Sequence, residues 1–184
     1  MTNRYHIMRN QPRAHTVGNV EYINEEWVFF DEESEEAFLL SEVAEDNFEI
    51  FYNNLWLPAR FYENDMLKIE NEIYAIQNGE KIRVRKKLQY VYEEWIKELS
   101  DPSFSTLTTA LAELEYSLYD SIYCHNFLFF QVTKPPRQGV NFLIYDNGDI
   151  ISSLHHHYIR GCSMTKDTFI FTRADGRSLT VSSP

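Results

Sequence analysis

Glycine is scarce in this chain, at six of 184 residues. Three of the six, Gly79, Gly148 and Gly176, follow Asn or Asp between strand-like runs, where a hairpin turn needs a positive φ. No phosphate-cradling loop remains, because neither G-x-x-x-x-G-K-[ST] nor G-x-G-x-x-G occurs. The sequence therefore excludes a P-loop nucleotide hydrolase and a dinucleotide enzyme of the G-x-G-x-x-G type. The motifs G-x-S-x-G and H-E-x-x-H are missing too, although residues far apart in sequence can still converge on a catalytic site.

Cysteine is scarcer still, since Cys124 and Cys162 are the only two. Two cysteines do not make a disulfide framework. No apolar run approaches the roughly 18 residues that span a bilayer, and the N-terminus has no apolar stretch typical of a secretory signal. We therefore expect a cytoplasmic protein with reduced thiols and no membrane partner.

Basic residues are sparse where acidic ones are densest. Residues 21–72 carry sixteen carboxylates against Arg60 and Lys68, a formal charge of −14. The first twenty residues carry three arginines and no carboxylate, and residues 73–184 carry twelve charges of each sign. The net charge of −11 is therefore the excess of the segment 21–72. A field of one sign selects binding partners, but it does not select a fold.

Residues 14–88 read as short strands separated by polar turns. Their spacing of about ten residues favours a small antiparallel barrel or curled sheet. The chain has 13 Phe, 12 Tyr and 3 Trp, which offer much apolar surface to bury. We therefore predict a small antiparallel β-barrel-like unit and assign residues 1–88 to it as a first domain.

The middle of the chain has helical periodicity. Residues 89–99 place apolar side chains at helical spacing, and Asp101-Pro102 then resembles the start of a second helix. Large apolar residues recur every three or four positions beyond that point, which predicts a helix over residues 102–122. The members of this stripe are Phe104, Leu107, Leu111, Leu114, Leu118 and Ile122.

The last third of the chain returns to strands, over residues 126–132, 140–146, 149–159, 167–172 and 177–182. Because strands and helices are segregated rather than alternating, the pattern predicts an α+β fold. The barrel-like unit would be followed by two helices packed on a C-terminal antiparallel β-meander, which together form a second domain of residues 89–184.

An acidic run lies between two aromatic-rich strands. It can be a solvated turn that protects a sheet edge, or a docking face for a basic protein surface. A calcium loop is disfavoured because the central glycine of that motif is missing. Our first functional hypothesis is a non-catalytic protein-interaction module with an acidic docking surface and no cofactor. The residues proposed to bind the partner are Asp31, Glu32, Glu33, Glu35 and Glu36.

A basic strand follows the acidic segment. Alternation places Lys81, Arg83, Arg85 and Lys87 on one face, and Ile82 and Val84 on the other. The basic face can be a nucleic-acid patch, or it can pair with the acidic surface of its own domain. Since residues 14–88 are strongly acidic as a whole, they would repel a polyanion, which argues against nucleic acid as a partner.

Four aromatic residues, Tyr52, Trp56, Phe61 and Tyr62, crowd one part of the first β region. Most of them should belong to the core. Any that remain exposed beside carboxylates would form an amphipathic rim suited to binding a peptide or protein.

Cysteine and histidine gather in the last third of the chain. If residues 150–159 form a strand, His155 and His157 share one face while His156 points to the other. Two ring nitrogens and a thiolate could complete a zinc site, but the spacing matches no standard zinc template. Exposed or hydrogen-bonded histidines are the alternative. The second hypothesis is thus a metal-binding protein or metal-dependent enzyme that uses Cys124, His155, His157 and Cys162.

The stretch RAHTVGNVEYINEEWVFFDEESEEAFLL, together with YDSIYCHNFLFF further on, resembles an uncharacterised family of small cytosolic proteins from low-GC Gram-positive bacteria. The members of that family are grouped only as a domain of unknown function. The resemblance implies a bacterial cytosolic setting. It implies no activity, no substrate and no catalytic residue.

Overall fold

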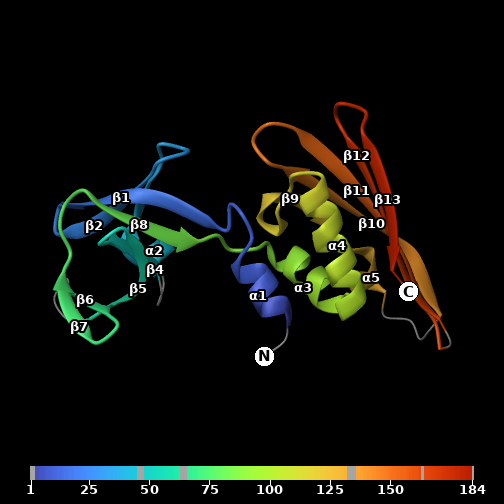
Figure 1. Ribbon diagram of the computed structural model, residues 1–184, viewed down its shortest axis with the longest axis horizontal. Coiled ribbons are helices and arrows are strands. Elements are labelled where there is room, and N and C mark those ends of the chain that lie inside the picture. The colour runs from blue at the N-terminus through green and yellow to red at the C-terminus, as the bar shows by residue number, and fades with distance from the viewer. Residues whose placement is uncertain (1–2, 45–47, 63–65, 132–135, 163, 184) are drawn as a thin grey trace. The chain divides into compact units, whose positions relative to one another are not determined.

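The computed structural model divides the chain into two compact units (Figure 1). Residues 15–86 carry seventeen carboxylates against six Lys or Arg, a formal charge of −11, and are termed the acidic unit. Residues 1–14 and 87–184 carry eleven charges of each sign and are termed the neutral unit. The structure describes residues 3–44, 48–62, 66–131, 136–162 and 164–183.

The acidic unit is one antiparallel sheet with the strand order β3-β2-β1-β8-β4-β5-β6-β7. Its elements are β1 (His15–Ile23), β2 (Glu26–Asp31), β3 (Ala37–Leu39), α2 (Leu40–Val43), β4 (Phe48–Tyr52), β5 (Leu55–Phe61), β6 (Met66–Ile69), β7 (Glu72–Ala75) and β8 (Glu80–Arg85).

Strand β8 lies in the interior of this sheet, between β1 and β4. Ile82 and Val84 are buried in the core, while Lys81 and Arg83 face the other side, as the alternation predicts. Gly18 on β1 keeps a continuous register with both neighbouring strands, so no bulge occurs there. A Cβ atom at this position would collide with the Phe30 carbonyl oxygen and lie 2.6 Å from the ring of Phe29. Glycine is required at position 18 because the main chains of β1 and β2 approach closely there, not because the strand bends.

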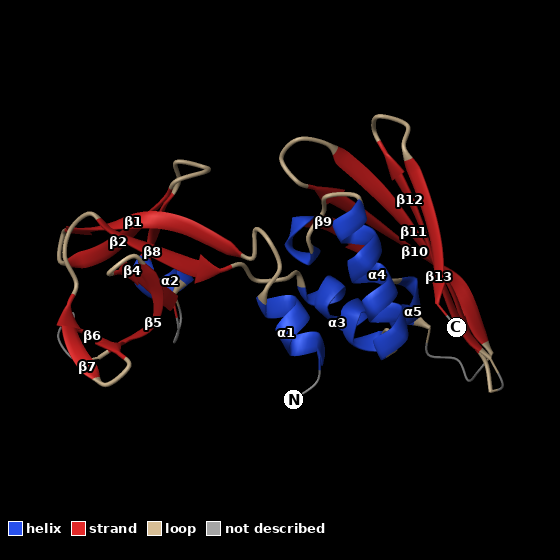
Figure 2. Ribbon diagram, in the orientation of Figure 1, coloured by secondary structure: helices blue, strands red, loops and turns tan. Residues whose placement is uncertain are grey.

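The neutral unit is built on a second antiparallel sheet, with the strand order β13-β12-β11-β10-β9. Its helices lie on one face of that sheet (Figure 2). Its elements are α1 (Asn3–Arg9), α3 (Tyr90–Glu98), α4 (Asp101–Glu113), a 3-10 turn η1 (Leu118–Asp120), β9 (Ser121–His125), α5 (Phe127–Phe130), β10 (Arg137–Asp146), β11 (Ile151–Arg160), β12 (Thr165–Arg173) and β13 (Ser178–Ser183).

The predicted α+β fold class is wrong. The chain is mostly strand, at 50% against 23% helix, and its helices are small. The predicted barrel-like unit is an open sheet in the described part of the chain, since β3 and β7 end the strand order and do not pair with each other. These two strands have only three and four residues. A spacing of short strands is equally compatible with a closed barrel and an open sheet, so the sequence pattern could not separate them.

The predicted helix over residues 102–122 is also wrong in length. Helix α4 ends at Glu113, because Glu115 adopts a left-handed conformation with φ of 68° and the Tyr116 N–H bonds back to the Leu111 carbonyl. Ser117 and Asp120 then form a reciprocal capping box for η1. The chain turns into β9, where Ile122 is 51% exposed instead of buried.

The predicted strand over residues 126–132 contains the short helix α5. Asn126 accepts a hydrogen bond from the Phe129 N–H and so caps this helix. Residue 132 lies outside the described residues.

The core of the neutral unit is large and rich in aromatic rings. Trp95, Phe104 and Leu111 from the helices pack against sheet residues such as Leu154 and Phe171. In the part of the chain that the structure describes, no helix combines the length and hydropathy needed to cross a bilayer. A division into independently folding domains at residues 88 and 89 stays a prediction.

Candidate functional site

A buried polar cluster lies between α4 and the sheet of the neutral unit. His156 on β11, Asp167 on β12 and Ser103 on α4 are all fully buried. The His156 Nε2 lies 2.8 Å from Asp167 Oδ1, and the Ser103 hydroxyl donates to Asp167 Oδ2 at 2.5 Å. Arg160 also donates to Asp167 Oδ1, at 2.7 Å. The arginine therefore balances the charge of a carboxylate that is completely removed from solvent.

The hydrogen bonds define the tautomer of His156. The indole N–H of Trp95 can only donate, and it donates to His156 Nδ1 at 2.8 Å. Nδ1 must therefore carry the lone pair, and Nε2 must carry the proton that it donates to Asp167. The amide nitrogen of Asn141 approaches the same Nδ1 at 3.1 Å, while the Asn141 Oδ1 accepts from the Leu128 N–H. The ring of His156 also stacks on Phe169, with the centroids 4.8 Å apart.

Burial and hydrogen bonding shift both titrations in this cluster. Burial lowers the pKa of His156 below its ordinary value of 6.5, and the hydrogen bond to Asp167 offsets this only in part. Burial alone would raise the pKa of Asp167. Hydrogen bonds from His156, Ser103 and Arg160 outweigh that effect, so the pKa of Asp167 lies below its ordinary value. The pair is therefore a neutral imidazole and a carboxylate at neutral pH.

This cluster contains the residue types of a nucleophilic triad in the wrong order. In such a triad the imidazole lies between the hydroxyl and the carboxylate and removes the hydroxyl proton. Here Asp167 lies between Ser103 and His156, and the one basic nitrogen of His156 is occupied by Trp95. The arrangement cannot activate Ser103. It joins α3, α4, β11 and β12 in one fully paired network and is structural.

The sequence predicted only part of this cluster. Alternation along β11 correctly separated His156 from His155 and His157. It could not identify the partners, because Ser103 and Asp167 are 64 residues apart in the chain. A histidine on the apolar face of a strand was the one available signal.

The structure does not bring the four predicted metal ligands together on one face. Cys124 on β9 pairs with the inward-facing Leu143, whereas His155 and His157 are exposed on the opposite face of the sheet. Cys162 lies in the exposed turn after β11. Within the described residues no group of three His, Cys, Asp or Glu side chains is placed to hold a metal ion. The zinc site stays a prediction that no observation favours.

The thiol of Cys124 is also poorly suited to nucleophilic chemistry. Burial, together with a smaller effect of the neighbouring Glu98, raises its pKa to about 12. The thiolate is therefore almost unpopulated at neutral pH.

The acidic loop between β2 and β3 uses some of its own carboxylates. Asp31 accepts hydrogen bonds from the Glu33 N–H and the Ser34 hydroxyl, which orders the turn. Glu32 forms an ion pair with Lys81 at 2.8 Å, and Glu33 lies 3.8 Å from Lys86. Of the five predicted docking residues, the remaining two are exposed and form no ion pair within the described residues. They are Glu35 and Glu36.

The basic strand β8 pairs with the acidic surface of its own unit. Besides the Lys81–Glu32 pair, Arg83 forms an ion pair with Glu49 and lies over the ring of Trp56 at 4.8 Å. Two of the three early arginines form ion pairs within the neutral unit, Arg4 with Asp101 and Arg13 with Asp120.

Several aromatic residues of the acidic unit are more exposed than the sequence suggested. Tyr52 and Tyr62 are 40% and 51% exposed, and Trp56 and Phe61 are half-buried. The prediction that most of these four belong to the core is wrong. Tyr52 packs edge-on against Tyr74, whose hydroxyl donates to Glu80. Burial and this hydrogen bond raise the pKa of Tyr74 to about 12.

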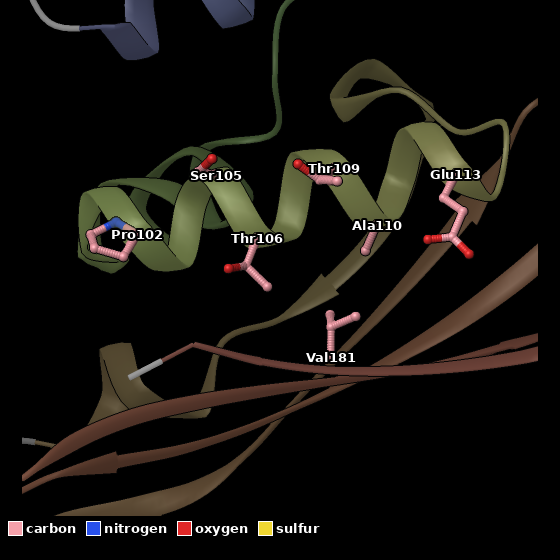
Figure 3. A pocket seen from close by; sticks show the side chains of 7 residues that line it. All are labelled: Pro102, Ser105, Thr106, Thr109, Ala110, Glu113 and Val181. Atoms are coloured by element: carbon pink, nitrogen blue, oxygen red, sulfur yellow. The ribbon is translucent and has the colours of Figure 1, made fainter.

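An open groove lies between α4 and β13 in the neutral unit (Figure 3). Its volume is about 350 Å³. Thr106, Ala110 and Glu113 point from the helix toward the strand, and Val181 points back from the strand. Pro102, Ser105 and Thr109 complete the lining. The sequence gives no sign of this groove, because only the tertiary structure brings α4 and β13 together.

A family model with the description protein of unknown function (DUF2777) matches residues 2–183, nearly the whole chain. This match confirms the resemblance to an uncharacterised family. Neither the search of curated proteins nor the search of solved structures gave a match.

Proposed function

The chain belongs to the family described as protein of unknown function (DUF2777), and because that description assigns no activity, we propose from the structure that the protein is a non-catalytic interaction module. The acidic unit docks on a basic surface of another protein. Electrostatic attraction speeds the encounter and makes the association depend on salt.

One observation carries this proposal: the acidic unit keeps a large excess of carboxylates after all its internal ion pairs. Its six basic side chains can neutralise at most six of its seventeen carboxylates. Lys81, Arg83 and Lys86 are already committed to glutamates of the same unit. Exposed groups that form no ion pair with any described residue, such as Glu35 and Glu36, are therefore available to a partner.

The tip of the β1–β2 hairpin adds apolar contact area to this charge. Tyr22 and Ile23 are 42% and 39% exposed, and Tyr22 packs on Trp27 with the ring centroids 5.2 Å apart. Glu25 and Glu26 are exposed in the same tip. Aromatic and aliphatic side chains beside carboxylates suit a partner that combines basic and apolar groups.

The test compares paired charge reversals in the full chain, with a fluorescent octalysine peptide as the basic probe. E35K/E36K changes the acidic loop, and E25K/E26K changes the hairpin tip. The control D149K/E115K makes the same charge change at two exposed sites of the neutral unit. We expect each acidic-unit variant to weaken binding by about tenfold at low salt and the control to weaken it by less than about threefold.

Two outcomes would contradict the docking proposal. One is an equal effect of the three double variants, which would mean that only net charge matters. The other is wild-type binding that does not change between about 50 and 500 mM salt, since screening must weaken an electrostatic encounter.

The cellular setting that accompanies this proposal is the cytoplasm of a low-GC Gram-positive bacterium. The resemblance of residues 13–40 and 119–130 to proteins of such bacteria supports it. The two cysteines support a reducing compartment as well, because Cys124 and Cys162 are both free.

A further inference from the structure

The outer edge of β13 differs from the other sheet edges of the molecule. Edge strands are normally protected from new partners by shortness, charge, bulges or a covering element. Strand β3 has three residues, and β7 has four and includes Glu72. Strand β9 carries a register irregularity opposite Ile144 and Tyr145 and is packed by α3. Strand β13 has six residues, no charged side chain and a continuous register, and although α4 packs beside it, no further strand pairs with its outer edge in the described part of the chain.

Strand β13 is a six-residue strand of sequence SLTVSS, with no charge, proline or glycine. Its pairing with β12 is continuous from Ser178 to Ser183. Because alternate residues of an antiparallel edge strand point their N–H and C=O groups away from the neighbour, β13 presents a regular row of main-chain donors and acceptors. In the described part of the chain no strand other than β12 pairs with residues 178–182 of this row, whereas Ser183 at its end is buried.

Helix α4 provides a second wall beside this edge. Thr106, Ala110 and Glu113 lie on one face of the helix and point toward Val181 across the open groove (Figure 3). The groove volume of about 350 Å³ is near the lower end of the roughly 300–1,000 Å³ typical of ligand sites, so it has room for one or two small side chains. Its floor is apolar, at Val181 and Ala110, and its rim carries the hydroxyls of Ser105, Thr106 and Thr109.

Charge selects one end of the groove. Glu113 is exposed and forms no ion pair within the described residues. It lies in the last turn of α4, where the helix macrodipole is also negative. A Lys or Arg side chain is therefore favoured at that end, whereas the other end has Asp101 already paired with Arg4.

We propose that the groove between α4 and β13 binds an extended segment of a partner protein, which adds to β13 as a sixth strand, places a small β-branched side chain against Val181 and Ala110, and pairs a Lys or Arg with Glu113. Main-chain hydrogen bonds to β13 supply general affinity, and the groove and Glu113 supply selectivity. The site is in the neutral unit, so it is independent of the docking by the acidic unit.

Two peptide probes test this proposal with the full-length protein. One is Lys-Thr-Val-Thr-Val-Thr and the other is Thr-Val-Thr-Val-Thr-Lys, because an added strand can run in either direction. We expect one of them to bind more tightly than the other. N-methylation of alternate residues in that peptide should abolish binding, and replacing its lysine by glutamate should weaken binding by about tenfold.

Matched substitutions on α4 locate the site. Thr109→Trp fills the groove from an exposed position, and Ala112→Trp adds the same side chain to an exposed position outside the groove. T109W should weaken binding of the better probe by about tenfold or more, and A112W should leave it within about twofold. Glu113→Gln should weaken binding of the lysine probe. It should change binding of the glutamate version of that probe by less than about twofold.

A measurement on the wild-type protein tests the proposal even if the substituted proteins do not fold. Addition of the better probe should slow hydrogen exchange of the amides of residues 178–182 and leave the amides of β3 and β7 unchanged. Absence of binding by both probes at millimolar concentration, or equal loss of binding in T109W and A112W, would overturn the proposal. A concentration-dependent dimer that T109W abolishes would also overturn it, since the occupant would then be a second copy of the chain.

Discussion

The two units have the same kind of architecture but differ in where their polar and charged side chains lie. Both are antiparallel sheets with a single buried cluster. Among the described residues, all buried polar and charged side chains belong to the neutral unit, and the charged groups of the acidic unit form exposed or half-buried pairs such as Lys81–Glu32. The neutral unit instead buries a complete polar network around His156 and Asp167. The described charged groups of the acidic unit are thus exposed or half-buried, whereas the neutral unit also buries the carboxylate of Asp167 in its packed interior.

Removing the carboxylate at the centre of the network should have the largest effect. Asp167→Ala leaves His156, Ser103 and Arg160 without their acceptor. We expect the free energy of unfolding of the neutral unit to fall by about 3–5 kcal/mol. Trp95, the single tryptophan of that unit, reports its urea unfolding in a W27F/W56F background. The exposed control Asp149→Ala should stay within about 0.5 kcal/mol of wild type. A loss below about 1 kcal/mol in D167A would mean that the network does not hold the unit together.

A leucine of the apolar stripe should come next. Leu111→Ala removes a fully buried side chain from the face of α4 that packs on the sheet, and it should cost about 2–5 kcal/mol. Ile122→Ala should cost less than about 0.5 kcal/mol, because Ile122 is exposed on β9. A continuous helix over residues 102–122 would make both substitutions costly, so equal losses in urea titrations would contradict the observed helix end.

In the acidic unit, the close approach of β1 and β2 at Gly18 gives the corresponding test. Gly18→Ala places a methyl group against the Phe30 carbonyl and the Phe29 ring, and should cost about 1–3 kcal/mol by overpacking. At Gly161 the nearest atom to an added Cβ is 3.2 Å away, so Gly161→Ala should cost less. Thermal unfolding monitored by Trp27 and Trp56 measures the first variant. A bulge at Gly18 would have predicted a nearly neutral substitution.

The two units should differ in their response to pH. The pKa of His156 is lowered by folding, so the unfolded state binds the proton more readily and the neutral unit loses stability as the pH falls below about 6.5. The pKa of Asp167 is lowered as well, so its contribution is lost in a second step as the pH falls below its ordinary value of 3.8. The slope for one proton cannot exceed about 1.4 kcal/mol per pH unit.

The loss of stability linked to His156 is measured from the midpoints of urea unfolding, followed by Trp95 fluorescence, at pH values between about 8 and 5. His156→Gln should be less stable overall and have a flatter profile, because the substituted side chain does not titrate. An unchanged slope in H156Q would assign the pH dependence to other groups.

The smallest effect should be that of salt. Raising the ionic strength from about 0.05 to 0.5 M screens the self-repulsion of the acidic unit and should stabilise it by less than about 1 kcal/mol. The neutral unit, with no net charge, should change less. Two-wavelength melting curves that separate Trp95 from Trp27 and Trp56 would show this difference. Equal shifts in both units would indicate a general salt effect rather than screening.

Local sequence patterns predicted individual helices and strands better than they predicted how these elements are arranged in the fold. The period of two placed Ile82 and Val84 inside, and helical spacing placed α3 close to residues 89–99. The helical period also continued through Leu118 and Ile122, where the chain had already turned, because apolar spacing does not register a left-handed residue such as Glu115. Leu114 at the C-terminal cap of α4 and Leu118 in the 3-10 turn η1 are nevertheless buried, which shows that the same apolar residues can serve a core in another geometry.

For the candidate sites as well, the sequence predicted local properties but not the contacts between distant residues. The acidic loop could be predicted because charge density is a property of the sequence, but its pairs with Lys81 and Lys86 depend on the register of β8 beside β1. The metal hypothesis relied on proximity in sequence, and the strand places Cys124 on the opposite face from His155. The groove beside β13 had no sequence signal, since neither α4 nor β13 is unusual alone.

By itself, the sequence determined where charge is concentrated, which phosphate-binding and catalytic motifs are missing, and where glycine supplies positive φ in hairpins, because these depend on neighbours along the chain. Only the tertiary structure decided which carboxylates are neutralised, that Ser103, His156 and Asp167 meet, and that one sheet edge stays open beside a helix. The physical reason is that strand register and helix docking bring together residues separated by tens of positions, and burial then sets the charge state and accessibility of each group.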